Sequence, residues 1–206
     1  MTLELVALDC PTCGSSVEAE GGDVVYYCIS CRNGYFFDRQ DRALRPVDVA
    51  FVALSHVSAE RYLPFWHLPA TIEIHQRDAQ AGSFRGLIKS FASLFTDDSG
   101  PSRAAGSFVV PAFDASLAAV TELVRRYTLA FPSLGEKLGE RLVGGCYGVE
   151  DARKLAHFAL IATEVERPDL LKKLDYSIEF GAARLLGVPF VEQGGGWRDA
   201  LNEIRI

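Results

Sequence analysis

Two pairs of cysteines near the start of the chain constrain its fold more than any other feature. Each pair, Cys10 with Cys13 and Cys28 with Cys31, has two residues between its cysteines, and fourteen residues separate the pairs. Two intervening residues let a tight turn direct both sulfurs at one ion, and four thiolates complete a tetrahedral shell without a position for water. The sequence therefore predicts one structural metal site with these four side chains as its ligands.

Zinc is the metal that this pattern favours, and iron stays open as the alternative. A rubredoxin-like iron centre also uses four thiolates, so the spacing alone does not separate the two metals. Disulfide bonds are disfavoured, because the chain has five cysteines and the residues after Met1 lack the basic and apolar segments of a secretion signal. We therefore expect a cytoplasmic protein that holds one structural Zn²⁺ per chain.

Turn-forming residues around the cysteines predict a small three-stranded sheet. Gly14 follows the first pair and Asn33-Gly34 follows the second, and both supply backbone freedom that a metal-binding turn needs. Gly21-Gly22-Asp23 is typical of a hairpin turn. The expected strands lie at residues 16–18, 24–28 and 35–38.

With Cys-Pro-x-Cys-Gly at 10–14 and Cys-x-x-Cys-x-x-Gly at 28–34, residues 1–40 resemble the rubredoxin-type zinc-ribbon family. The resemblance covers about a fifth of the chain and implies the ribbon fold and the metal. It implies little about function, because ribbons occur in polymerase subunits, ribosomal proteins, enzymes and adaptors alike. We divide the chain into a zinc ribbon at residues 1–45 and an α+β domain at residues 46–206.

Two strands are expected early in the larger domain, after a charged linker at residues 38–47. An apolar run at 47–57 is typical of a buried strand, and the alternation from Trp66 to Ile74 puts one apolar face against a core. Two nearby prolines, Pro64 and Pro69, suggest an edge or entry position for the start of the second strand.

Helical and strand patterns follow one another irregularly through the remaining sequence. An apolar stripe favours a helix at 84–95, followed by a loop at 96–106, or by the tip of a long hairpin if 84–95 is strand. Asp114 is the expected N-cap of a helix that ends before Pro132. The other expected elements are strands at 107–113, 176–180 and 183–191, the last two as partners, a helix at 149–167, and a helical turn around Trp197. Because regular βαβ alternation is absent, the sequence predicts an N-terminal three-stranded zinc ribbon followed by a mixed α+β domain.

The charge balance argues against binding to nucleic acids. Residues 1–45 contain four basic and seven acidic side chains, and the whole chain has a formal net charge of −6 at pH 7. Phosphate binding requires a basic surface, since neutralised phosphates supply most of the non-specific affinity. A local basic groove is the alternative, if Arg125-Arg126 and Lys172-Lys173 converge. The sequence also has no apolar stretch long enough to predict a membrane span.

One further pair of residues offers a candidate active site. Cys146 lies in a glycine-rich turn just before the predicted helix at 149–167, where a helix N-terminus can lower the pKa of a thiol. His157 on the same helix is the candidate base. A buried, unreactive cysteine fits the same sequence.

Aromatic residues in the ribbon outnumber the places in its core. The core of a three-stranded sheet has room for about two or three rings, whereas the ribbon has Tyr26, Tyr27, Tyr35, Phe36 and Phe37. The remaining rings are expected either to pack against the larger domain through Phe65 and Trp66, or to form an exposed patch that binds a partner protein or a second copy of the chain.

The sequence therefore favours a zinc-binding intracellular protein whose ribbon is a structural protein-interaction module without a catalytic role. Two alternatives stay open: a nucleic-acid-binding or transcription-related ribbon protein, and an enzyme with its site in residues 46–206. The double change Cys28→Ser, Cys31→Ser is expected to unfold the ribbon, while residues 46–206 keep their own melting transition.

Overall fold

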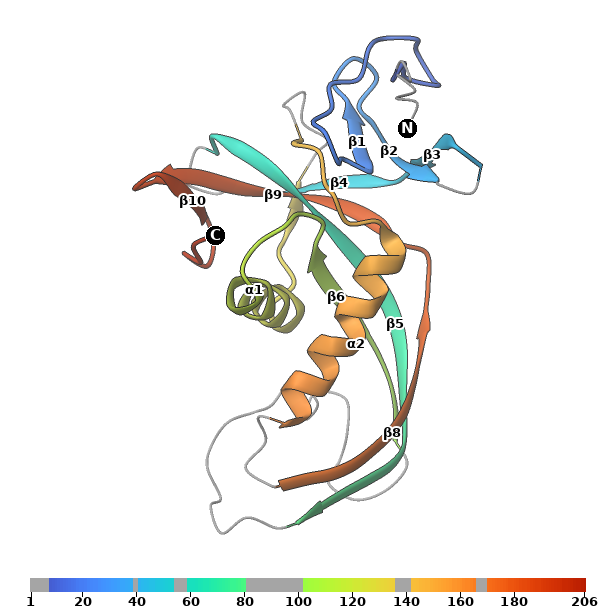
Figure 1. The fold of residues 1–206 in the computed structure, drawn as a ribbon, viewed down its shortest axis with the longest axis vertical. Helices are drawn as coiled ribbons and strands as arrows, with labels where there is room; N and C mark the ends of the chain where they lie inside the picture. Colours follow the sequence, from blue (N-terminus) through green and yellow to red (C-terminus); the bar gives the residue numbers. More distant parts are fainter. Residues whose placement is uncertain (1–7, 39–40, 54–58, 81–101, 136–141, 166–169) are drawn as a thin grey trace, which may run out of the picture.

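The structure of the protein is a computed structural model that describes residues 8–38, 41–53, 59–80, 102–135, 142–165 and 170–206. These residues form two β-sheets and two helices, which fits an α+β architecture (Figure 1). The small N-terminal sheet lies at one end of the molecule, and the longest strands extend toward the other end.

The small sheet has three antiparallel strands in the order β1-β2-β3. They are β1 (Val25–Cys28), β2 (Asn33–Asp38) and β3 (Ala43–Val47). Two predicted strands are confirmed, but the third is β3, in the predicted linker, and not residues 16–18, where Ser16 forms an isolated bridge to Asp9. The sequence gives no signal for β3, because its side chains are mostly exposed and its backbone pairing with β2 defines it.

The large sheet is mixed, with strands in the order β6-β5-β9-β4-β7, β8 beside β5 and β10 beside β9. β4 and β9 pair in parallel, and the other described pairs are antiparallel. The strands are β4 (Val49–Val52), β5 (Arg61–Gln80), β6 (Ser102–Pro111), β7 (Leu134–Gly135), β8 (Leu170–Phe180), β9 (Arg184–Gln193) and β10 (Gly196–Asp199).

The 20-residue strand β5 pairs with three other strands of the large sheet. One edge of β5 pairs with β6, and the other pairs with β9 up to His67 and with β8 from Ala70 onward. Of the two predicted alternatives, the edge position is therefore wrong, whereas Pro64 does lie near the entry of the strand, which begins at Arg61. Pro69 is tolerated because it lies where β9 gives way to β8. The carbonyl of Pro69 accepts a hydrogen bond from Gly181 N–H at 2.8 Å, on the edge of β5 that pairs with β9 and β8. The nitrogen of Pro69 points to the same edge, between the ends of these two strands, so its missing N–H removes no hydrogen bond of the sheet.

Two predictions for the C-terminal third are also wrong. The strands predicted at 176–180 and 183–191 exist within β8 and β9, but each pairs with β5 and not with the other. The tail around Trp197 forms strand β10, which returns along β9 after a turn at Gly194-Gly195, in place of the predicted helical turn. Periodicity indicates a strand, but it does not specify a partner that is distant in sequence.

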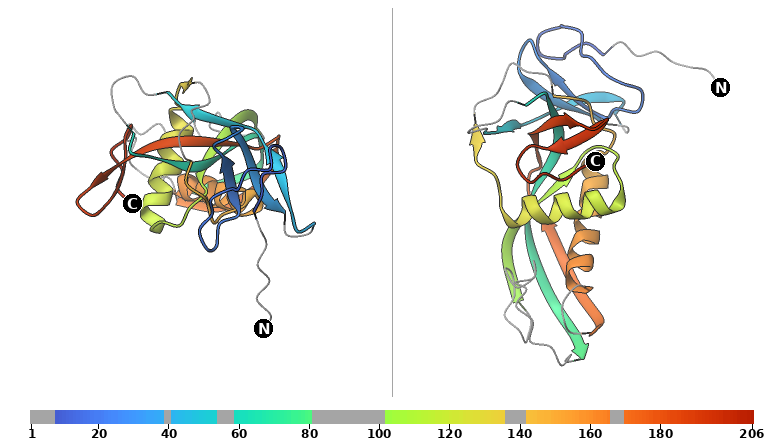
Figure 2. Two further views of the ribbon diagram at one scale, coloured as in Figure 1. Left: turned by 90° about the horizontal axis from the view of Figure 1, so that it is seen from above. Right: turned by 90° about the vertical axis from the view of Figure 1, so that its left-hand side faces the viewer.

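Two helices, α1 (Leu117–Leu129) and α2 (Val149–Val165), pack against the large sheet and run in different directions (Figure 2). Both helices are predicted by the sequence. The N-cap of α1 is Ser116, whose Oγ accepts from Ala119 N–H at 3.3 Å, and not Asp114. Asp114 Oδ1 instead accepts from Tyr147 Oη at 3.0 Å.

Besides a small cluster in the N-terminal sheet, the described buried residues form two clusters on opposite faces of β5. The predicted alternation is confirmed, since Trp66, Leu68, Ala70, Ile72 and Ile74 belong to the first cluster, whereas Leu63 and Phe65 belong to the second. Helix α2 packs against the first cluster. Helix α1 contributes to both, with Val120 and Val124 in the first and Leu123 and Tyr127 in the second.

The predicted helix at 84–95 lies outside the described residues, as does the predicted loop from 96 to 101. Residues 102–106 belong to β6, so the loop prediction is wrong there. In the predicted apolar strand at 47–57, β4 confirms residues 49–52, and residues 54–58 lie outside the described part.

Candidate metal centre

The four predicted ligands lie together in the small sheet and its turns. All four Sγ atoms are within 4.8 Å of one another, and the distances are 3.5 Å for Cys10–Cys31 and 3.6 Å for Cys13–Cys28. Zn–S bonds of about 2.3 Å in a tetrahedron put neighbouring sulfurs about 3.8 Å apart. The four free thiols therefore fit one tetrahedral metal ion such as zinc.

Tight turns direct each pair of sulfurs to the common centre. In the first turn Gly14 N–H donates to Cys10 O at 2.9 Å, and in the second Arg32 N–H donates to Cys28 O at 2.7 Å. Gly14 and Arg32 have φ angles of +69° and +58°, in the left-handed region that glycine adopts most easily. The sequence correctly predicts an unusual backbone conformation at Gly14. In the second turn, the residue with a positive φ angle is Arg32 and not Asn33 or Gly34.

Strand alternation explains why the metal centre has its own small core. Along β1, Tyr26 and Cys28 face the core of the ribbon, whereas Val25 and Tyr27 face the first cluster of the large sheet. Tyr35 lies directly opposite Tyr26 in the β1–β2 pairing and joins the same ribbon core. Cys10 and Cys28 are consequently buried, Cys31 is half-buried and Cys13 is exposed.

Hydrogen bonds and burial act in opposite directions on the thiols of the site. Burial raises the pKa of Cys28 to about 11. Burial also opposes ionisation of Cys10, but hydrogen bonds from Tyr35 and from the backbone of Cys13 and Thr12 together lower its pKa to about 6. A bound cation would bring both Cys10 and Cys28, despite these opposite pKa shifts, to the thiolate form that metals require.

The sequence does not identify two residues that touch the ligands. Tyr35 Oη lies 3.2 Å from Cys10 Sγ and 2.7 Å from Thr12 Oγ1. The sequence indicates Tyr35 only as an apolar ring, because Cys10 lies 25 residues earlier, in a turn outside the three strands. The one sequence signal for this contact is the hydroxyl of Thr12, which lies between Cys10 and Cys13 and can form a hydrogen bond beside the ligands. Asn33 Nδ2 also donates to Cys31 Sγ, at 3.4 Å.

The ribbon is joined to the large sheet by backbone and aromatic contacts, which we call the seam. Val25 and Gly145 pair as an antiparallel bridge, with N–H to O distances of 3.0 and 3.3 Å. Gly34 lies so close to Val49 that a β-carbon at Gly34 would be 2.1 Å from Val49 Cγ2. The small sheet therefore packs directly against the large one.

Several of the aromatic residues singled out in the sequence meet at the seam. Tyr27 packs edge-on against Phe51, with ring centroids 5.4 Å apart, and Phe36 packs edge-on against Trp66 at 6.3 Å. Phe65 lies elsewhere, in the second cluster. Because these rings are buried or half-buried, they do not form the exposed aromatic patch that the sequence offers as an alternative.

The structure does not bring Cys146 and His157 together as a catalytic pair. Burial raises the pKa of the Cys146 thiol, whereas a nucleophilic cysteine needs a lowered one. His157 lies about 12 Å along the helix axis from Val149, the first residue of α2. Its Nδ1 is 3.2 Å from Tyr176 Oη, and its ring packs against Phe180.

The two basic pairs lie on different elements, Arg125-Arg126 on α1 and Lys172-Lys173 on β8. Arg125 and Arg126 both form ion pairs with Glu122, at 2.6 and 2.7 Å. Lys173 lies on β8, opposite Asp78 of β5, and donates to Gln76 Oε1 at 2.7 Å. Each pair is thus accompanied by a carboxylate on its own part of the surface.

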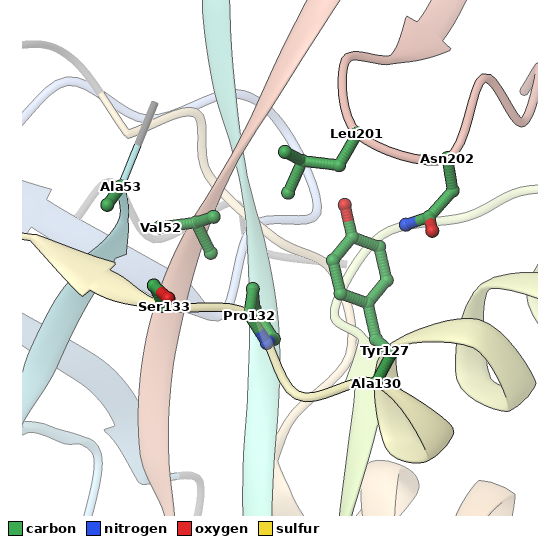
Figure 3. Close-up of a pocket in the computed structure, with 8 residues that line it drawn as sticks. All are labelled: Val52, Ala53, Tyr127, Ala130, Pro132, Ser133, Leu201 and Asn202. Atoms are coloured by element: carbon green, nitrogen blue, oxygen red, sulfur yellow. The ribbon is translucent and has the colours of Figure 1, made fainter. Parts of the chain in front are cut away.

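A pocket of about 390 Å³ lies between the end of α1 and the C-terminal segment (Figure 3). It is lined by Val52, Ala53, Tyr127, Ala130, Pro132, Ser133, Leu201 and Asn202. Tyr127 Oη donates to the fully buried Asp199 Oδ1 at 2.5 Å, and burial raises the pKa of this phenol beyond its usual range. Asp199 also accepts from the N–H groups of Leu201 and Asn202. Tyr127 and Asp199 therefore use their polar groups to fix the C-terminal segment against α1.

Comparisons of the chain with protein-family models, with curated proteins and with solved structures found no match. Neither of the described helices is long and apolar enough to cross a membrane. The functional argument therefore depends on the metal centre and its surroundings.

Proposed function

We propose that this chain is a zinc protein of the cytoplasm whose ribbon holds one structural Zn²⁺ and serves protein interaction without catalysis. The convergence of four sulfurs within 4.8 Å supports the metal. Four protein ligands complete a tetrahedral shell, so the ion has no open position for a substrate or an activated water. A reducing compartment keeps these four thiols available for the metal.

The metal content tests the first part of this proposal. We expect about one zinc per chain in the purified protein, measured by elemental mass spectrometry, and loss of stoichiometric zinc in Cys28→Ser. Cys146→Ser is the matched control and keeps its zinc, because Cys146 lies outside the cluster of ligands. Wild-type protein without zinc, or a red iron-containing protein from its native host, contradicts the assignment.

The exposed side chain of Ile29 favours interaction as the role of the ribbon. Ile29 lies in the second metal-binding turn, between Cys28 and Cys31, and 43% of it is exposed. The ion holds this turn rigid, so an apolar contact there costs little ordering on binding. With the ribbon aromatics packed in its own core or at the seam, Ile29 is the large apolar side chain that the described part of the ribbon presents to solvent.

Affinity capture from native lysate with nuclease treatment tests this role. We expect Ile29→Ser to lose the captured protein while it keeps its zinc. Phe158→Ser is the control, because Phe158 is similarly exposed, at 44%, but lies on α2. If capture is lost only in Phe158→Ser, α2 and not the ribbon makes the contact. Capture that nuclease abolishes supports the nucleic-acid alternative.

A further inference from the structure

Tyr35 is the one phenol of the ribbon core whose hydroxyl reaches the candidate ligands in the described structure. The residue is 1% exposed, and its Oη lies 3.2 Å from Cys10 Sγ and 4.0 Å from Cys31 Sγ, one sulfur from each cysteine pair. The same oxygen lies 2.7 Å from Thr12 Oγ1, in the turn between Cys10 and Cys13. One hydroxyl on β2 thus contacts both metal-binding turns.

The chemistry of a thiolate determines the direction of these hydrogen bonds. A metal-bound thiolate accepts hydrogen bonds and has no proton to donate, so Tyr35 O–H donates to Cys10 Sγ when Cys10 binds the ion. The Thr12 hydroxyl can then donate to Tyr35 Oη, because hydroxyl hydrogens rotate to suit their partners. This arrangement orders the phenol, fixes the position of the sulfur and withdraws electron density from it.

We propose that Tyr35 is a positioning residue of the metal centre: its hydroxyl orients the Cys10 thiolate and connects the two metal-binding turns, with Thr12 ordering that hydroxyl. This inference depends on the metal binding proposed above. Outer contacts to metal ligands typically change the metal affinity by about 10–100-fold when they are removed.

The chain contains a closely matched control for the loss of one phenol hydroxyl. Tyr26 lies opposite Tyr35 in the β1–β2 pairing and is buried in the same small core. Its hydroxyl donates to the backbone oxygen of Asp23 at 2.5 Å and not to a sulfur. Tyr35→Phe and Tyr26→Phe therefore remove the same atom from equivalent places, and only the first removes a contact with a ligand.

The test uses the full chain loaded with Zn²⁺ or with Co²⁺. Competition against a chromophoric chelator measures the zinc affinity, and absorption of the cobalt form measures sulfur-to-metal charge transfer, which reports electron donation by the thiolates. We expect Tyr35→Phe to weaken zinc binding by about 10–100-fold and to shift the charge-transfer band. Thr12→Val changes both in the same direction by less, and Tyr26→Phe leaves both unchanged.

The outcomes separate this inference from the metal assignment. Wild-type affinity and an unshifted cobalt band in Tyr35→Phe overturn the role of Tyr35 while the zinc site stands. If Tyr35→Phe does not fold, Thr12→Val decides by the same two measurements, and wild-type values there overturn the inference. Failure of the wild-type chain to take up either metal overturns the metal assignment and this inference together.

Discussion

Removal of the metal is expected to destabilise the whole chain and not only its N-terminal sheet. The reason lies at the seam, where Val25 and Tyr27 of β1 are buried in the main core beside Phe51. If the double change Cys28→Ser, Cys31→Ser disorders the ribbon, these side chains leave that core. The sequence suggests that residues 46–206 keep an independent melting transition. Because the two parts share this core, we instead expect loss of the metal to lower the melting temperature of the whole chain.

The size of the effect follows from the apolar side chains that leave the seam. Burial of one such side chain contributes about 1.5–3 kcal/mol, so loss of Val25, Tyr27 and Phe36 removes about 5–9 kcal/mol. For a chain of this size, about 2–4 °C accompanies each kcal/mol, so we expect the melting temperature to fall by about 10–35 °C. Calorimetry measures the transition, and the emission of Trp66, 1% exposed at the seam, should shift to the red.

Cys146→Ser is the control for the loss of a thiol outside the metal site. Its melting should stay close to that of the wild type, because Cys146 is half-buried and is not a ligand. Two separate transitions in the metal-free protein, the upper one unchanged from the wild type, would show that the ribbon folds independently of the large sheet.

Gly34→Ala is expected to cost about 1–3 kcal/mol of folding stability through overpacking at the seam. The new β-carbon would lie 2.1 Å from Val49 Cγ2 and 3.1 Å from the backbone oxygen of Val47. Val49 is 1% exposed, so its side chain has little room to move away, and the backbone of Val47 is held by its pairing with Gly34. Denaturant unfolding of the zinc-loaded protein measures the loss.

Two further variants identify the origin of this effect. Gly21→Ala should be close to neutral, because a β-carbon at that position would meet no atom within 4 Å. In the double variant Gly34→Ala, Val49→Ala, the clashing Cγ2 is gone, so its destabilisation should be smaller than the sum of the two single changes. Additive losses would mean that the clash with Val49 is not the cause.

The grouping of the four cysteines at the candidate metal centre was predictable from sequence. Cysteine spacing is a local signal with a narrow chemical interpretation, so Cys10, Cys13, Cys28 and Cys31 follow from four positions alone. The contact between Tyr35 and Cys10 was not predictable in the same way. It joins β2 to a turn that lies 25 residues earlier in the chain, which no spacing within a single strand specifies.

The same distinction applies to the fold. The alternation from Trp66 to Ile74 and the helix at α2 were predicted because each depends on residues that are close in sequence. Strand β3 was missed because its side chains carry no apolar pattern and its place depends on hydrogen bonds to β2. The predicted pairing of β8 with β9 was wrong because both strands pair with successive parts of β5, which is far away in the sequence.

The position of β5 at the centre of the large sheet bears on how the chain folds while it is being synthesised. Phe65 pairs with Leu186, so β5 emerges from the ribosome well over a hundred residues before β9. At about 5–20 residues per second, this strand waits on the order of ten seconds for its partner. During that time the apolar residues of β5 have no complete core to enter. A nascent chain of this protein therefore presents a long apolar strand to chaperones, and the large sheet is expected to be completed only after β9 has emerged.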